Sequence, residues 1–238
     1  MTFNHLKLTL LGIVLFAFVS VQAQKILVGV GGGGGTFNMG STKEFNQSVV
    51  NLLPFKPVVT DNFPPWIFEQ VEALYCFPKN LAIGFNLSAT STGSRLSLAD
   101  YSGKYTFDNV QRGFFPGIKL LFGKAPGRLN NLNFSLELGA SFSKMTLKED
   151  MKVYADSTLS NSDFNAMGLF VQPGFCYFYQ INSKLRVSAT VSYYYGIEKG
   201  YHLPKAKGQR LINPETHNPV KPQWDGIRVG ITAYWSLQ

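Results

Sequence analysis

Apolar and polar residues alternate along most of this chain, and that alternation limits its possible folds more than any other feature. In 185–198, every second residue from Leu185 to Ile197 is apolar or aromatic, and the residues between them are mostly small or polar. A period of two residues is typical of a β-strand with unlike faces. Similar segments occur at 25–37, 66–77, 81–90, 111–122, 132–143, 164–180 and 226–237. The pattern therefore predicts eight strands and an all-β fold.

The lengths of the connections predict how these strands are joined. The shorter connections cover residues 78–80, 123–131 and 181–183. The longer ones alternate with them and cover residues 39–64, 94–109, 148–162 and 199–223. Short turns at one end, long loops at the other and an even strand number are typical of an outer-membrane β-barrel. We therefore expect an eight-stranded antiparallel up-and-down transmembrane β-barrel, with the long loops outside the cell.

A soluble secreted sandwich or lipocalin-like barrel is the alternative, and it would turn its apolar face inward. Small residues dominate the polar face of these segments, which suits a narrow packed lumen better than a solvated surface. Aromatic residues also flank the apolar face at segment ends, as in the interfacial girdles of membrane barrels. They are Tyr75, Phe77, Tyr177, Tyr179, Tyr193, Tyr195, Tyr234 and Trp235. Both features favour the membrane barrel.

The N-terminus has the features of an export signal. Lys7 precedes the apolar segment 8–21, and Val21-Gln22-Ala23 fits a small-residue cleavage site. An apolar run of this length is short for a membrane span but suits a signal peptide; a buried core helix is the alternative. We therefore predict a signal peptide at 1–23, a barrel domain at 24–238 and a location in the outer membrane.

The whole expected barrel resembles a known family. The Gly-rich first segment 29–36 and the alternating segments are similar to the small outer-membrane β-barrels widespread in Bacteroidota, often labelled PorT-like. The architecture is also similar to the transmembrane barrels of OmpX and OmpA. The resemblance implies an accessory role in secretion or envelope assembly.

The inward faces of the expected strands carry charged residues. They are Glu72, Lys119, Glu137, Arg186 and Arg228. An eight-stranded barrel is just wide enough for side chains to fill its interior. Unpaired buried charges are costly, so we expect these five residues to form a mutually satisfied ion-pair network. This favours a filled lumen, with a small porin-like channel or transporter as the alternative.

Several motifs that suggest enzyme or cofactor chemistry have simpler explanations. Gly29, Gly31 and Gly34 match a dinucleotide-binding spacing, but that motif requires a βαβ unit. His202 and His217 have neither the spacing nor the third ligand of a metal site. We therefore predict no catalytic, cofactor-binding or metal-binding residues, and no enzymatic activity.

The two cysteines invite a disulfide in an exported protein. Cys76 and Cys176 fall on the second and sixth strands, which lie opposite each other in a ring of eight. A disulfide requires Cα atoms within about 7 Å. We therefore expect two free thiols.

The first long connection contains a helical pattern. Ser41 and Glu44 have capping-box spacing, and Pro54 ends the apolar periodicity that follows them. We expect an amphipathic helix at 42–53. Its apolar residues either pack over the barrel mouth as a lid or dock another envelope protein. They are Phe45, Val49, Leu52 and Leu53.

The fourth long connection is basic. Lys205, Lys207 and Arg210 could contact lipopolysaccharide phosphates, or could simply be solvated. The pI of about 9.4 would suit nucleic-acid binding, but an exported barrel meets none. We expect a monomeric barrel that contacts outer-membrane lipid. Its external loops would serve surface interaction or an accessory envelope role.

Overall fold

The computed structural model describes residues 25–77, 80–101, 103–123, 131–154 and 156–237. The expected signal peptide at 1–23 lies outside these residues. The described residues form eleven strands and one helix. They are β1 (Lys25–Gly35), α2 (Gly40–Leu52), β2 (Val58–Asn62), β3 (Trp66–Cys76), β4 (Leu81–Asp100), β5 (Gly103–Gly123), β6 (Asn131–Val153), β7 (Asp156–Gln180), β8 (Leu185–Glu198), β9 (His202–Leu203), β10 (Ala206–Arg210) and β11 (Gly226–Leu237).

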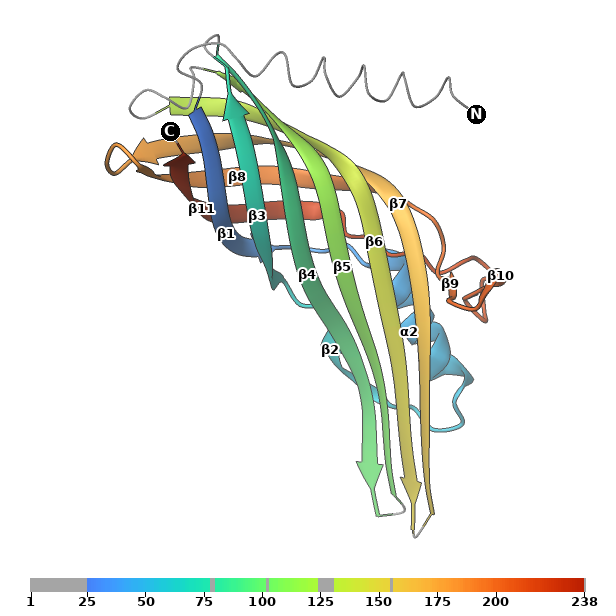
Figure 1. Ribbon diagram of the computed structural model, residues 1–238. Helices are drawn as coiled ribbons and strands as arrows, with labels where there is room; N and C mark the ends of the chain where they lie inside the picture. The colour runs from blue at the N-terminus through green and yellow to red at the C-terminus, as the bar shows by residue number, and fades with distance from the viewer. Residues whose placement is uncertain (1–24, 78–79, 102, 124–130, 155, 238) are drawn as a thin grey trace, which may run out of the picture.

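Eight of the strands form a closed antiparallel ring, in the order β1-β3-β4-β5-β6-β7-β8-β11. The ring closes where β1 pairs with β11, from Ile26 opposite Leu237 to Gly35 opposite Arg228. β1 begins and β11 ends at the same end of the barrel (Figure 1). The predicted eight-stranded up-and-down barrel is therefore confirmed. The short strands β2 and β9 pair with β4 and β7, and β10 pairs with β9.

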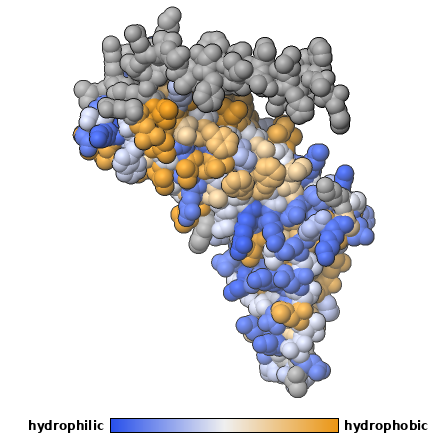
Figure 2. Space-filling model, in the orientation of Figure 1, coloured by the Kyte–Doolittle hydropathy of each residue, from blue (hydrophilic) through white to orange (hydrophobic). Residues whose placement is uncertain are grey.

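The barrel is apolar outside and polar inside. Its outward side chains include Val30 and Ile231, which are 58% and 61% exposed. Polar residues such as Gln70, Asn86 and Ser188 are buried inside. Figure 2 shows the apolar side chains gathered on the barrel part of the molecule, beside a more hydrophilic projection. A continuous apolar outer surface of this size is stable only against an apolar solvent, so the barrel is built to lie in lipid.

Among the described residues, no helix is long and apolar enough to cross a membrane.

Two of the expected loops are strands instead. Residues 94–109 and 148–162 were expected as loops, but β4 and β5 stay paired up to Asp100 and Gly103, and β6 and β7 up to Val153 and Asp156. Beyond the membrane the strands keep their period but reverse their polarity. Leu96, Tyr105 and Phe107 are buried on the inner face, whereas Arg95 and Lys148 are exposed on the outer face. The two hairpins form a sheet that projects from the barrel (Figure 1).

The helix α2 lies against the inner face of this projecting sheet (Figure 1). It begins at Gly40, two residues before the expected start. The expected capping box is wrong, because no side chain caps the helix from the N-cap residue Met39. Instead, the backbone N–H of Ser41 donates to Oε1 of Gln223 at 2.6 Å, and the Ser41 hydroxyl accepts from the backbone N–H of Lys221. Residues of the last long connection, before β11, thus cap the helix that lies in the first long connection, after β1.

The glycine run of β1 lets this strand approach β11 closely. A Cβ atom on Gly33 would meet the carbonyl oxygen of Val229 and lie 2.5 Å from the Cα atom of Gly230. Because both atoms belong to the backbone, they cannot rotate away. The next residue, Gly34, points outward and has no atom within 4 Å of that position. The inward glycines therefore belong to the closing seam of the barrel.

We predict that Gly33→Ala destabilises the barrel by roughly 1–3 kcal/mol, the range found when a packed site is overfilled. The neighbouring Gly34→Ala is the control and should leave stability within about 0.5 kcal/mol. Urea unfolding in lipid vesicles, followed by the heat-dependent gel mobility of folded barrels, measures both. Equal stability of the two variants would show that the seam tolerates a side chain at this point.

Candidate functional site

The lumen is the candidate functional site, and its end at the short turns is filled by a largely apolar layer. Side chains from six of the ring strands meet there, and all are buried. The layer consists of Leu27, Leu74, Cys76, Ala82, Leu121, Cys176, Phe178 and Tyr234. Neither described cysteine takes part in a disulfide, as expected. The Thr190 hydroxyl instead donates to Sγ of Cys176 at 3.4 Å.

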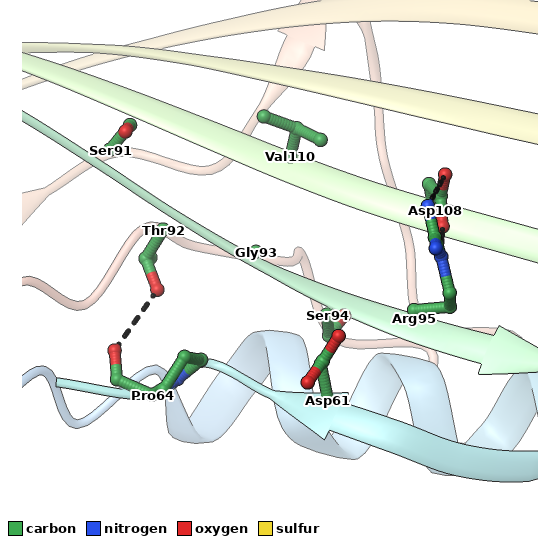
Figure 3. A pocket seen from close by; sticks show the side chains of 9 residues that line it. All are labelled: Asp61, Pro64, Ser91, Thr92, Gly93, Ser94, Arg95, Asp108 and Val110. Carbon is green, nitrogen blue, oxygen red and sulfur yellow. Dashed lines mark hydrogen bonds and ion pairs between the residues drawn. The ribbon is translucent and has the colours of Figure 1, made fainter. Parts of the chain in front are cut away.

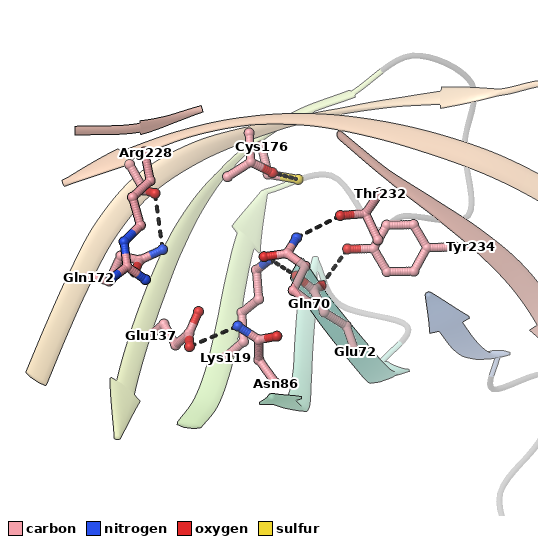
Figure 4. Close-up of polar contacts among 12 residues, drawn as sticks. Gln70, Glu72, Asn86, Lys119, Glu137, Gln172, Cys176, Arg228, Thr232 and Tyr234 are labelled. Carbon is pink, nitrogen blue, oxygen red and sulfur yellow. Dashed lines mark hydrogen bonds and ion pairs between the residues drawn. The ribbon is translucent and has the colours of Figure 1, made fainter. Parts of the chain in front are cut away.

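A polar layer lies next to this apolar one. Nζ of Lys119 and Oε1 of Glu72 form an ion pair at 2.7 Å, with both side chains almost completely buried. The Tyr234 hydroxyl donates to the other oxygen of Glu72. Nδ2 of Asn86 donates to Oε1 of Glu137 at 2.8 Å. Figure 4 shows these contacts crossing the interior between β3, β4, β5, β6 and β11.

Arg228 is held mainly by aromatic rings. Its guanidinium carbon lies 4.1 Å from the ring centroid of Tyr194 and 4.8 Å from that of Phe115. One guanidinium nitrogen donates to Oε1 of Gln172 at 3.3 Å. Cation–π contacts of this kind gain strength where water is excluded. Arg228 therefore joins the polar layer to the aromatic side chains beyond it.

The five inward charges do not form the single network expected from the sequence. Glu72 and Lys119 are the one ion pair among them within the described residues. Arg186 is fully buried, and its guanidinium nitrogens have no hydrogen-bond acceptor in the described part of the chain. Arg186 is the second residue of β8, at the end of the barrel where the apolar layer lies, whereas Glu72 and Glu137 belong to the polar layer.

An aromatic layer follows on the side of the projecting sheet. It contains Phe37, Met39, Phe63, Phe115, Phe170, Tyr194 and Trp224. The indole N–H of Trp224 donates to the Ser143 hydroxyl at 2.8 Å. A cavity among the polar residues, lined by Gln70, Lys119 and Arg228, has a volume of about 10 Å³. That is barely room for one water molecule. The lumen is therefore filled at this level.

The helix α2 packs above these layers. Phe45 is buried, and Val49 and Leu53 pack against a cluster that includes Leu96, Tyr105 and Phe107. Polar contacts fix the helix as well: Asn46 donates to the Ser94 hydroxyl at 2.6 Å, and Gln111 donates to the Thr42 hydroxyl at 2.9 Å. Of the four residues considered for docking a partner, Leu52 alone is strongly exposed. The other three form the packing face, so the arrangement is that of a lid.

A surface pocket of about 380 Å³ lies outside the lumen, between β2 and the β4–β5 hairpin (Figure 3). Arg95 and Asp108 form an ion pair at its edge, with Nε and Oδ1 2.6 Å apart. The Thr92 hydroxyl donates to the carbonyl oxygen of Pro64 at 3.3 Å. Asp61 also lines the pocket, so its charged residues are two acids and one base, and Arg95 is already paired with Asp108.

The basic residues expected to contact lipopolysaccharide lie on or beside β10. Lys205 is exposed in the turn before this strand, and Arg210 at its end lines a pocket with Lys199 and Lys221. The side chain of Lys207 lies outside the described residues. His202 borders the same pocket, and His217 lies in the connection before β11. Among the described residues, no group of three or more His, Cys, Asp or Glu is placed to hold a metal ion.

Sequence reasoning missed the aromatic layer. Phe115 and Lys119 lie on the same inward face of β5. The alternation that predicted an inward Lys119 therefore also predicts an inward Phe115. Trp224 was harder to place, because it directly follows a predicted loop and carries no strand pattern. Tyr201 is also buried, and its hydroxyl donates to Oε1 of Gln111 at 2.8 Å. It was missed because it lies within the predicted loop 199–223.

Comparison with known proteins supports the fold. No protein-family model and no curated protein matches the sequence. Among solved structures, the chain is similar to a major outer membrane protein from Thermus thermophilus, with a TM-score of 0.52, 10% identity, and coverage of 91% of this chain and 100% of that one. Ail, the attachment invasion locus protein of Yersinia pestis, gives a TM-score of 0.37 at 11% identity, covering 90% of this chain and 97% of its own.

The similarity to the Thermus protein concerns the fold alone. It agrees with the closed ring and the apolar outer surface, so the chain has the fold of an outer-membrane β-barrel.

We predict that Lys119→Met destabilises the barrel by about 3–5 kcal/mol, because it leaves the Glu72 carboxylate buried without its cation. The double variant Glu72→Gln/Lys119→Met should recover most of this loss, since it removes both charges. Urea unfolding in lipid vesicles measures the difference, with the exposed Lys148→Met as control. Equal losses in the single and double variants would contradict an energetically coupled pair.

Proposed function

We propose that this protein is a non-conducting outer-membrane barrel that carries a rigid extracellular platform for contacts at the cell surface. The observation that carries the proposal is the filling of the lumen by successive side-chain layers, capped by α2. A barrel so filled has little room for a solute path. What remains available for function is the projecting sheet and the rim around it.

The projecting sheet has the properties of a contact surface. From Arg112 to Gly103, β5 extends for about 30 Å beyond the last outward aromatic residue, at ~3.3 Å per residue. Its tips expose large side chains: Tyr101 is 97% exposed and Tyr154 is 85% exposed. Aromatic residues supply contact area at a low entropy cost and are enriched in protein interfaces. We assign surface interaction to these tips, not to α2.

The PorT-like resemblance makes the proposal more specific. It suggests that the partner is another envelope protein and that the barrel is an accessory component of secretion or envelope assembly. The barrel itself would be monomeric, because its ring closes within one chain and leaves no open strand pair in the membrane part.

Recordings in planar lipid bilayers test the filled lumen. We expect no steady conductance from the wild-type protein. We expect none after deletion of 40–52 either, because the polar and aromatic layers stay in place beneath the helix. Arg228→Ala is the sensitive variant, since it removes the side chain that joins those layers. A stable wild-type conductance that changes in Arg228→Ala would instead favour the small porin-like channel.

The contact surface is tested by purifying the tagged protein from outer membranes in mild detergent. We expect a stoichiometric envelope protein to co-purify with the wild type and to be lost with Tyr101→Ser/Tyr154→Ser. Leu52→Ser, which changes the exposed side of α2, is the control and should retain it. Loss with Leu52→Ser and retention with the tip variant would move the contact surface back to the helix.

A further inference from the structure

Two basic side chains face each other on the outer surface, directly beyond the apolar barrel. Arg112 on β5 lies opposite Lys144 on β6, and the next outward pair toward the membrane is Phe114 opposite Phe142. The aromatic pair is 45% and 44% exposed, which places it in the lipid-facing belt. Like charges directly opposite each other on a sheet destabilise it. Asp163, which pairs with Lys144 and also interacts with the charge of Arg112, offsets part of this repulsion, and an anion bound between the two basic side chains would offset the rest.

A pocket of about 490 Å³ lies at this position. Arg112, Lys144 and His202 line its polar side, and Phe114, Phe142 and Met167 line its apolar side. The pocket therefore presents positive charge toward the aqueous side and an apolar wall toward the membrane. A phospholipid-like molecule matches this arrangement, because its charged headgroup lies at the aqueous side and its acyl chains lie in the membrane.

The charges of the pocket are only partly neutralised within the protein. Nζ of Lys144 and Oδ2 of Asp163 lie 2.8 Å apart, and the Thr146 hydroxyl donates to the other oxygen of Asp163. The hydrogen bonds from Lys144 and Thr146 hold the pKa of Asp163 below its usual range, so this carboxylate stays ionised. Arg112 forms no ion pair with the described residues. The pocket therefore has one net positive charge, and Asp163 holds the Lys144 ammonium in place.

A second pocket continues the basic surface. Its volume is about 580 Å³, and it shares Met167 and His202 with the first. Lys199, Arg210 and Lys221 also line it, against the single acidic residue Glu198. The bases thus follow the outer rim from β5 to the connection before β11.

We propose that the pocket between Arg112 and Lys144 binds the phosphate of an outer-leaflet lipid, whose acyl chains lie on Phe114, Phe142 and Met167. The proposal rests on the proposed function only in requiring the barrel to lie in the membrane. It moves the main lipid contact from the loop residues Lys205, Lys207 and Arg210 to the strand pair β5–β6. Arg210 then belongs to the adjoining second pocket.

The chain offers a matched control for this site. Lys104 lies opposite Lys152 on the same two strands and the same outward face, eight residues further from the membrane. At ~3.3 Å per residue, that pair stands about 26 Å from Arg112, well beyond the distance over which salt screens charge. Arg112→Gln/Lys144→Gln and Lys104→Gln/Lys152→Gln therefore remove equal charge at different heights.

Native mass spectrometry of the folded protein in detergent, titrated with phosphorylated lipid A, tests the proposal. We expect lipid A to remain bound to the wild type and to bind roughly 30-fold more weakly to Arg112→Gln/Lys144→Gln, as expected for two juxtamembrane charges. The Lys104→Gln/Lys152→Gln control should bind like the wild type. Arg112→Gln alone removes an unpaired surface side chain, so it should fold and bind about fivefold more weakly.

Other ligands separate the possible sources of the phosphate. Diacylglycerol, which has acyl chains but no phosphate, should bind weakly and equally to all variants. Inorganic phosphate should not displace lipid A from the wild type. Equal lipid A binding by wild type and Arg112→Gln/Lys144→Gln, or full displacement by inorganic phosphate, would overturn the proposal. Heat-dependent gel mobility in lipid vesicles checks insertion separately, so failure to insert would count against the proposed function.

Discussion

Lipid offers no hydrogen bonds to a backbone, so every strand of this protein must be paired on both edges within the membrane. The pairing of β1 with β11 meets that demand, and the rest of the structure follows from it. A ring of eight strands leaves a narrow interior, which side chains fill. Glycines at the seam let β1 lie against β11, and the ion pair of Glu72 with Lys119 joins β3 to β5 inside the lumen, with one strand between them. Closure thus determines both the packed lumen and the apolar outer surface.

The strands β4 to β7 continue without interruption from the lipid-facing barrel into the projecting sheet, which faces water. In the membrane their outward residues are apolar and their inward residues polar. Beyond it, many outward residues are polar or charged, such as Arg95 and Lys148, and inward residues such as Leu96 and Phe107 belong to the cluster that packs on α2. The change occurs within one outward step, between Phe114 and Arg112 on β5 and between Phe142 and Lys144 on β6. This sharp boundary brings basic and aromatic side chains together at the rim, where a phosphorylated lipid would bind.

The strand number, the order of the ring and the inward direction of Glu72, Lys119 and Arg228 were predictable, because they depend on local alternation. The extended hairpins were not recognised, although residues 94–109 keep a period of two. In these hairpins the apolar residues face inward and the polar residues face outward, the reverse of the membrane part. Because one apolar outward face was expected throughout, loops were predicted here. The cap of α2 was beyond sequence reasoning, because Gln223 is 182 residues from Ser41. The pairing of inward charges was also unpredictable, because strand tilt decides which of them share a level.

The cap that Gln223 provides has a consequence for the order of assembly. Residues of the first long connection leave the ribosome early, yet the N-terminus of α2 and its contacts with Glu215 require the segment before the last strand. Contacts between such distant parts of a chain form late and slowly. The N-terminus of the helix therefore gains its cap only when the segment before β11 is in place, whereas its apolar face packs on β4 and β5. A capped N-terminus of α2 therefore indicates that the segment leading into the closing strand has reached its native position.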